Sequence, residues 1–104
     1  WFLFEGLVKH DFETGKSETL NFGEGRFGSE APFAPRVGAR SEDDGYIVSF
    51  ITDMVENRSE CVLIDAQNIA DGPVCRIILP HRISSGTHAC WADGPTVRAA
   101  QSAA

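Results

Sequence analysis

The hydrophobic and polar positions of this chain predict strands rather than helices. Short apolar runs rich in Val, Ile, Phe and Tyr alternate with turns rich in Gly, Pro, Asp and Asn. We expect five strands, over residues 2–12, 17–22, 46–51, 61–64 and 74–79. No stretch carries a convincing helical pattern. The pattern therefore predicts an all-β fold of antiparallel strands.

The first two runs are expected to form a β-hairpin. Between them lies the sequence ETGK, in which Gly15 offers the positive φ that a tight turn needs. Short strands at this spacing are typical of a sandwich, a barrel or the blades of a propeller. Five strands would make about one four-stranded blade and part of the next, and a single blade leaves its faces and edges open.

The segments between the strands are interpreted as loops. Residues 23–28 match the dinucleotide-binding pattern G-x-G-x-x-G, which must open a helix. Pro32 and Pro35 follow at once and exclude that helix, so we interpret residues 23–28 as a glycine-rich loop and residues 29–40 as extended. Residues 96–104 are small and polar, and we expect a frayed tail there.

Length and charge narrow the class of protein. The chain has 104 residues, enough for one domain at most, and it starts at Trp1 rather than Met, so we expect a piece of a longer protein. A net charge of −6 makes nucleic acid a poor partner. No apolar run approaches the ~18 residues of a membrane span. Three cysteines do not form a disulfide framework, and we expect reduced thiols in a cytoplasmic protein.

Histidines and carboxylates are the candidate chemical groups. The three histidines, His10, His81 and His88, lack the close spacing of a metal site on one element, although His88 lies in an irregular segment after a glycine. Glu30 is the only carboxylate of the apolar segment 27–35. It is expected either to face solvent or to hold a buried donor such as a histidine N–H. Asp43 and Asp44 are interpreted as part of a solvated turn.

Several stretches, taken in order, resemble the C-terminal end of the carotenoid cleavage oxygenase family, which includes lignostilbene dioxygenases. They are residues 6–15 (GLVKHDFETG), 28–36 (GSEAPFAPR), 42–50 (EDDGYIVSF), 63–66 (LIDA), 79–83 (LPHRI) and 86–91 (GTHACW). Small departures occur: Ala31 stands where the family usually has proline, and Ala89 and Cys90 differ from the usual closing motif.

The resemblance implies a seven-bladed β-propeller, of which residues 1–104 would be a C-terminal fragment forming the last one to two blades. In that family four histidines hold a non-haem Fe(2+), and glutamates hydrogen-bond ligand histidines. Position by position, His88 matches the last iron ligand and Glu30 matches such a glutamate, whereas His10 and His81 match no ligand. Imidazole suits iron, and a carboxylate on its other nitrogen fixes the ring.

The implied activity is oxidative cleavage of a C=C bond of a carotenoid, apocarotenoid or stilbene with O2, giving carbonyl products. The implied partners are an apolar substrate, O2 and the missing N-terminal blades, which would bring the other three ligands; the fragment alone is expected to be inactive. Two alternatives remain open: a small all-β binding or interaction module without catalysis, and an inactive relic that completes its sheet with another chain. Nucleotide binding is a distant third.

Overall fold

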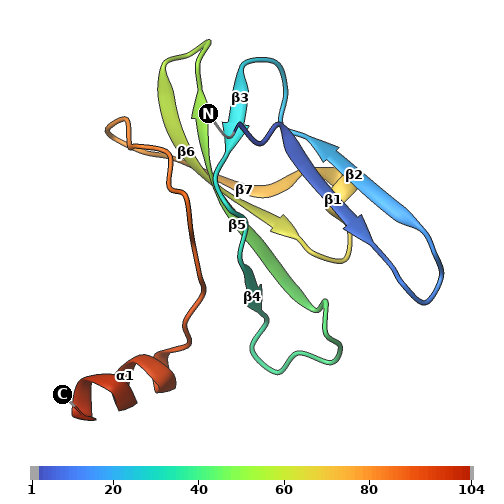
Figure 1. Ribbon diagram of the computed structural model, residues 1–104, viewed down its shortest axis with the longest axis vertical. Helices are drawn as coiled ribbons and strands as arrows, with labels where there is room; N and C mark the ends of the chain where they lie inside the picture. Colours follow the sequence, from blue (N-terminus) through green and yellow to red (C-terminus); the bar gives the residue numbers. More distant parts are fainter. Residues whose placement is uncertain (1–2, 104) are drawn as a thin grey trace.

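The computed structural model describes residues 3–103, which form two antiparallel sheets and a C-terminal helix (Figure 1). The elements are β1 (Gly6–His10), β2 (Ser17–Asn21), β3 (Arg26–Gly28), β4 (Phe33–Pro35), β5 (Gly45–Asp53), β6 (Arg58–Asp65), a short 3-10 helix η1 (Ile69–Asp71), β7 (Pro73–Ile78) and α1 (Gly94–Ala103). The predicted all-β character is confirmed for residues 6–78, apart from the single turn of η1.

Strands β1 and β2 form the predicted hairpin. Its turn is organised by Asp11, whose carboxylate accepts hydrogen bonds from the backbone N–H groups of Glu13 and Thr14. Gly15 has a φ of 72°, a conformation in which a residue with a Cβ is disfavoured. The local sequence alone is thus sufficient to specify this turn.

The second sheet has five strands and is built on the long strand β5. Strand β6 pairs with it from Tyr46↔Asp65 to Asp53↔Arg58, and β7 pairs with the far edge of β6. On the other edge of β5, the three-residue strands β3 and β4 pair with different halves of it. These two strands were not predicted, because their own sequences are glycine- or proline-containing and they depend on β5 for their hydrogen bonds.

One face of this sheet carries the core, and the hairpin covers it. Side chains that face each other across β5 and β6 alternate strictly between the two faces. The buried core cluster consists of Phe22, Ile51, Val62, Ile64 and Ile69, with Leu7, Leu20 and Ile47 packed against it. Leu7 of β1 and Leu20 of β2 therefore cover this core, and their packing docks the hairpin on this face of the sheet.

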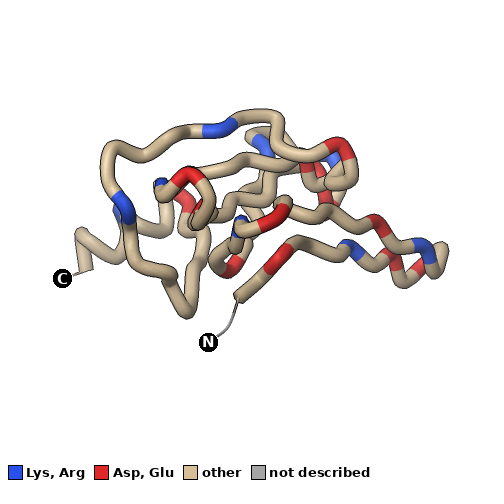
Figure 2. The backbone as a smooth tube through the Cα atoms, turned by 90° about the horizontal axis from the view of Figure 1, so that it is seen from above, with Lys and Arg blue, Asp and Glu red and all other residues tan. Residues whose placement is uncertain are grey.

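A buried ionic cluster lies on the same face near the turn that joins β5 to β6. The Glu60 side chain is fully buried, and the Arg26 guanidinium lies 2.6 Å from its Oε1 and 2.7 Å from Oδ2 of Asp53. This hydrogen bond from Arg26 holds the pKa of Glu60 below its usual range. Elsewhere in residues 3–103, Lys and Arg are interspersed with Asp and Glu along the chain (Figure 2).

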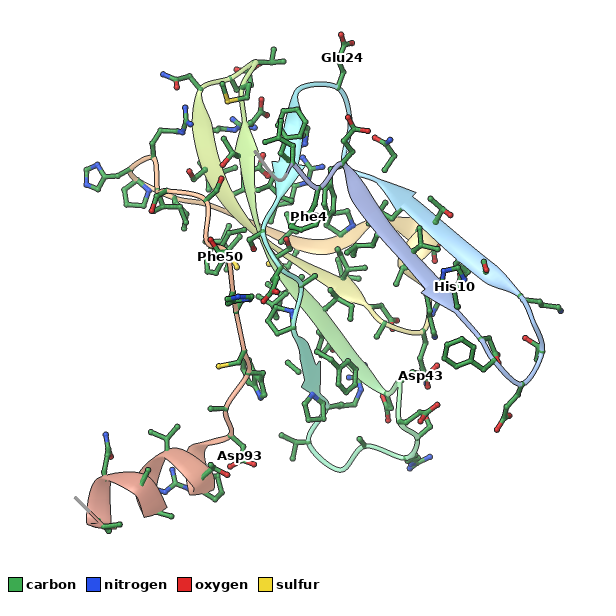
Figure 3. All side chains as sticks on the ribbon, in the orientation of Figure 1. Phe4, His10, Glu24, Asp43, Phe50 and Asp93 are labelled. Atoms are coloured by element: carbon green, nitrogen blue, oxygen red, sulfur yellow. The ribbon has the colours of Figure 1, made fainter. Side chains whose placement is uncertain are left out.

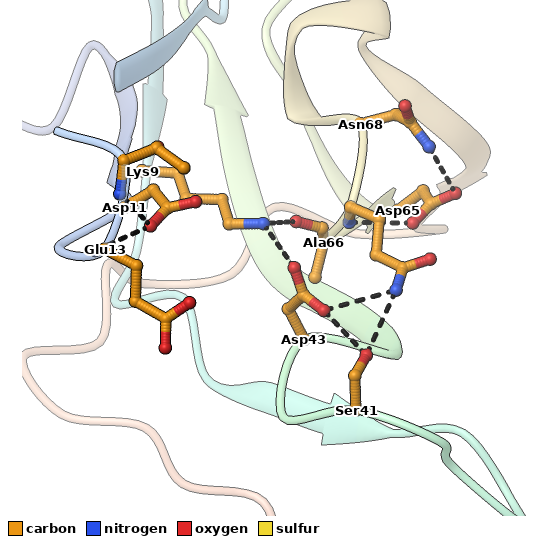
Figure 4. A network of polar contacts seen from close by, with 10 residues as sticks. Lys9, Asp11, Glu13, Ser41, Asp43, Asp65, Ala66 and Asn68 are labelled. Carbon is orange, nitrogen blue, oxygen red and sulfur yellow. Dashed lines mark hydrogen bonds and ion pairs between the residues drawn. The ribbon is translucent and has the colours of Figure 1, made fainter. Parts of the chain in front are cut away.

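A second polar network ties the hairpin to the sheet through Asp43, which lies in the predicted turn with its side chain 37% exposed. The Lys9 ammonium donates to Oδ2 of Asp43 at 2.8 Å and to the carbonyl of Ala66 at 2.9 Å (Figure 4). Ser41 and Gln67 donate to the other oxygen of the same carboxylate. The hydrogen bond from Lys9 is the main reason that the pKa of Asp43 lies well below its usual range.

The C-terminal part of the chain differs from prediction. A frayed tail was expected over residues 96–104, but residues 94–103 form helix α1, and Ala104 lies outside the described residues. The helix is capped by Asp93, whose carboxylate accepts from the Thr96 N–H at 2.7 Å. The helix has no buried residue and lies apart from the sheets (Figure 1). The radius of gyration, 15.1 Å, accordingly exceeds the ~13 Å of a compact domain of this size. Among the described residues, no helix has the length and apolar character needed to span a membrane.

The ionic cluster yields a stability prediction. Arg26→Met should leave Glu60 buried without its main partner and lower the free energy of unfolding by about 3 kcal/mol. Folding lowers the pKa of Glu60, so the stabilisation is present above about pH 4.3 and is lost as the pH falls through the lowered value. Urea unfolding at several pH values should therefore show a difference from wild type that shrinks in acid.

Arg36→Met is the matched control, because Arg36 makes a half-exposed ion pair with Asp44. It should cost no more than about 1 kcal/mol. Equal losses in the two variants, or a loss in Arg26→Met that does not shrink in acid, would contradict the assignment.

Candidate functional site

Glu30 and His88 come together from distant parts of the chain. Glu30 lies in the connection between β3 and β4, and His88 lies in the irregular segment between β7 and α1. The Nδ1 atom of His88 is 3.0 Å from Oε1 of Glu30. The structure thus brings these two residues together although they are 58 positions apart, and the histidine is an exposed partner rather than the buried donor that was one of the two expectations.

The carboxylate also holds the backbone beside the ring. The N–H of Ala89 donates to Oε2 of Glu30 at 2.7 Å, so each oxygen of Glu30 binds one group of the same short segment. These bonds, from Ala89 first and His88 second, lower the pKa of Glu30. An ionised carboxylate only accepts hydrogen bonds, so the ring must place its proton on Nδ1.

In the neutral ring, a proton on Nδ1 leaves Nε2 with a free lone pair. Among residues 3–103, Nε2 has no hydrogen-bond partner, and the His88 side chain is 86% exposed. A neutral imidazole nitrogen, oriented from its other side by a carboxylate, is a typical metal donor in proteins. The pair can therefore supply one oriented ligand to a metal ion.

A hollow of about 460 Å³ lies beside the pair. It is lined by Phe4, Gly28, Glu30, Ser85, Gly86, Thr87 and His88. Phe4 reaches it through a single bridge to β3, in which the Gly28 N–H donates to the Phe4 carbonyl at 2.8 Å. The N-terminal segment and the His88 segment thus enclose the same space.

The other histidines lie elsewhere. His10 is on β1 of the hairpin, where its Nδ1 lies 2.8 Å from the Ser17 hydroxyl (Figure 3). His81 is exposed and precedes the site on the C-terminal segment. Within residues 3–103, no three His, Cys, Asp or Glu side chains gather closely enough to hold a metal ion. A metal ion held by His88 would therefore need further ligands from outside residues 3–103.

The glycine-rich motif takes no part in such a site. Gly23 and Gly25 have positive φ values in the turn before β3, and residues 26–28 pair with β5 instead of opening a helix. The expected exclusion of a dinucleotide-binding helix is confirmed for this segment. Sequence reasoning missed the Ala89 N–H, which no residue type can signal because it belongs to the backbone.

Comparisons with known proteins agree on one family. A sequence model of the family described as retinal pigment epithelial membrane protein matches residues 1–93. Lignostilbene-alpha,beta-dioxygenase isozyme III of Sphingomonas paucimobilis is 40% identical over 83 residues, which cover 80% of this chain and 17% of that protein. Carotenoid 9,10(9',10')-cleavage dioxygenase 1 of Arabidopsis thaliana is 39% identical, with 83% of this chain and 18% of that protein covered.

A solved structure shows the same arrangement of strands. The crystal structure of Pseudomonas brassicacearum lignostilbene dioxygenase matches with a TM-score of 0.81 and 37% identity, covering 88% of this chain and 19% of that one. The chain thus spans about a fifth of the length of the proteins that it matches.

The two hydrogen bonds accepted by the Glu30 carboxylate give a testable prediction. Glu30→Gln replaces one accepting oxygen with a donating amide, so it cannot accept from both Ala89 and the ring. Hydrogen exchange of the Ala89 amide should accelerate about tenfold. In the wild type, protection should persist as the pH falls below the ordinary glutamate value of about 4.3 and disappear only at the lowered pKa.

Glu24→Gln is the control, because Glu24 is exposed at the turn before β3 (Figure 3). It should leave the Ala89 amide unchanged. If Glu30→Gln exchanges like the wild type, the carboxylate does not hold this segment.

Proposed function

The chain belongs to the retinal pigment epithelial membrane protein family of carotenoid oxygenases, and we propose that it is the C-terminal part of a non-haem iron(II) dioxygenase. The proposed reaction is the oxidative cleavage of a C=C bond of a carotenoid, apocarotenoid or stilbene with O2, giving two carbonyl products. The observation that carries the proposal is the Glu30–His88 pair, which presents a free imidazole nitrogen beside a hollow.

In this proposal His88 binds iron through Nε2, and three further histidines come from the rest of the protein. Bound iron(II) supplies the activation of O2. Glu30 keeps the proton on Nδ1 and fixes the plane of the ring, and the Ala89 N–H fixes the carboxylate in turn. In this proposal neither Glu30 nor His88 acts as an acid or base: Glu30 orients the ring, and His88 donates the nitrogen.

The hollow beside His88 suits an apolar substrate. Phe4 contributes an aromatic residue to its lining, and Gly28 and Gly86 contribute residues without side chains. The relatives that match this chain are named for carotenoids, lignostilbene and isoeugenol, and these names support a substrate of that class.

The face of the sheet opposite the core supports the assignment to a propeller. The residues that share it by strand register are Val48, Phe50, Cys61, Leu63, Cys75 and Ile77. Phe50 is 42% exposed and Ile77 is 49% exposed, so a largely apolar sheet face has no cover within residues 3–103. We propose that the preceding blade of the same protein packs on this face.

Removing the donor gives the direct test of function. His88→Ala in the full-length protein should abolish iron binding and cleavage of a carotenoid or stilbene, measured by metal analysis and by product formation. Glu30→Gln should weaken iron binding about 10- to 100-fold.

His81→Ala is the matched control, because it removes an exposed histidine from the same segment. It should keep iron at the wild-type level. Full iron occupancy in His88→Ala would overturn the ligand assignment, and a wild-type protein that binds no iron would favour the alternative of a binding module.

The proposed packing of a neighbouring blade has its own test. Phe50→Ala should lower the free energy of unfolding of the full-length protein by about 3 kcal/mol if another blade buries the ring. Val37→Ala, at a side chain that is 100% exposed, should change it by less than about 0.5 kcal/mol. Similar small effects of both substitutions in chemical denaturation would show that the face stays uncovered.

A further inference from the structure

The backbone that carries Glu30 leaves the sheet through a β-bulge. Gly28 pairs with Ile51 and Phe33 pairs with Ile47, so four residues (29–32) on one side face three (48–50) on β5. One extra residue bends a strand and redirects a side chain. The extra residue here lies where Glu30 turns toward His88.

At Ser29, where the chain leaves the sheet, a side-chain hydrogen bond replaces a backbone one. The Ser29 N–H donates to the Phe50 carbonyl at 2.9 Å, as in a regular antiparallel pair. The reciprocal bond differs: the Phe50 N–H donates to the Ser29 hydroxyl at 3.1 Å instead of the Ser29 carbonyl. The same hydroxyl donates to the carbonyl of Glu30 at 2.8 Å.

Ser49 binds the Ser29 carbonyl, which makes no hydrogen bond to the Phe50 N–H. Its hydroxyl donates to the Ser29 carbonyl at 3.3 Å, and its side chain is fully buried. The next regular bond, from the Val48 N–H to the Pro32 carbonyl at 3.1 Å, closes the bulge. The carbonyls of Ser29 and Glu30, which flank the Cα of Glu30, therefore each accept a hydrogen bond from a serine hydroxyl.

The residue before the bulge is fixed as tightly. A Cβ on Gly28 would lie 2.6 Å from Cε2 of Phe22 and 3.0 Å from Oγ of Ser49, so the backbone here packs directly on the core. The backbone of Glu30 is thus fixed to the sheet, and its carboxylate binds the segment that carries His88.

We propose that Ser29 and Ser49 are positioning residues, which fix the backbone of Glu30 so that its carboxylate meets His88 Nδ1 and the Ala89 N–H together. The inference rests on the proposed function only for its consequence in iron binding. The hydrogen-bond geometry that it explains exists without a metal.

The test compares Ser29→Ala with Ser29→Thr in the full-length protein. Alanine leaves the Phe50 N–H and the Glu30 carbonyl without their partner, whereas threonine keeps the hydroxyl. The first readout is the fraction of the Nδ1–H tautomer of His88 in metal-free protein, from ring nitrogen shifts of 15N-histidine at pH 8. The second is Fe(2+) affinity by competition with a chelator.

Ser29→Ala should lower the Nδ1–H fraction and weaken Fe(2+) binding about tenfold, and Ser29→Thr should restore both. Ser49→Ala removes the longer bond and should act in the same direction with a smaller effect. Ile69→Val, a core substitution away from the bulge, serves as the stability control and should lower the melting temperature without changing either readout.

An unchanged tautomer and an unchanged affinity in Ser29→Ala would overturn the proposal, as would an equal change of both readouts in Ile69→Val. If the wild type binds no iron but Ser29→Ala still shifts the tautomer, the positioning role stands and the proposed function fails. If Ser29→Ala does not fold, Ser49→Ala and Ser29→Thr decide by the same two measurements.

Discussion

Backbone pairing along β5 determines where β3, β4 and β6 lie. One edge of β5 is filled by β6, and the other is shared by β3 and β4, which are too short to persist alone. Because these two strands pair with β5 in registers that differ by one residue, the chain between them must leave the sheet. The position of Glu30 follows from this mismatch, so the candidate site depends on strand pairing more than on the loops that surround it.

Two glutamates of the chain show how environment divides structural from chemical roles. Glu60 is fully buried, and its charge is neutralised by Arg26 with Arg58 and Arg76 close by. Glu30 is held by N–H groups of His88 and Ala89, with no Lys or Arg among its hydrogen-bond partners. Its negative charge therefore remains available to the imidazole, which raises the basicity of Nε2 as a ligand.

The sequence predicts those parts of the molecule whose signals are local. The hairpin follows from Asp11 and Gly15 in one turn, and the long strands follow from runs of β-branched and aromatic residues. Strand β3 could not be predicted, since its hydrogen bonds come from β5 rather than from its own composition. Helix α1 had a signal in Asp93 and the proline of its first turn, but its small polar residues suggested fraying.

Of the candidate site, only Glu30 and His88 could be predicted from the sequence. Glu30 stands out as a carboxylate in an apolar segment, and the order of motifs associates it with His88. Their meeting depends on contacts 58 residues apart, and the role of Ser29 depends on a hydroxyl that substitutes for a carbonyl. No spacing rule describes either.

The irregular segment after β7 carries the donor nitrogen but belongs to neither sheet. His88 is translated after all seven strands, and it lies on a segment without strand pairing that docks through Glu30. The strand ladders contain no residue after Ile78, so strand pairing does not involve the segment that carries the donor nitrogen. The position of this nitrogen therefore depends on how the segment docks on Glu30, and a change in that docking can move it while the strand pairing stays the same.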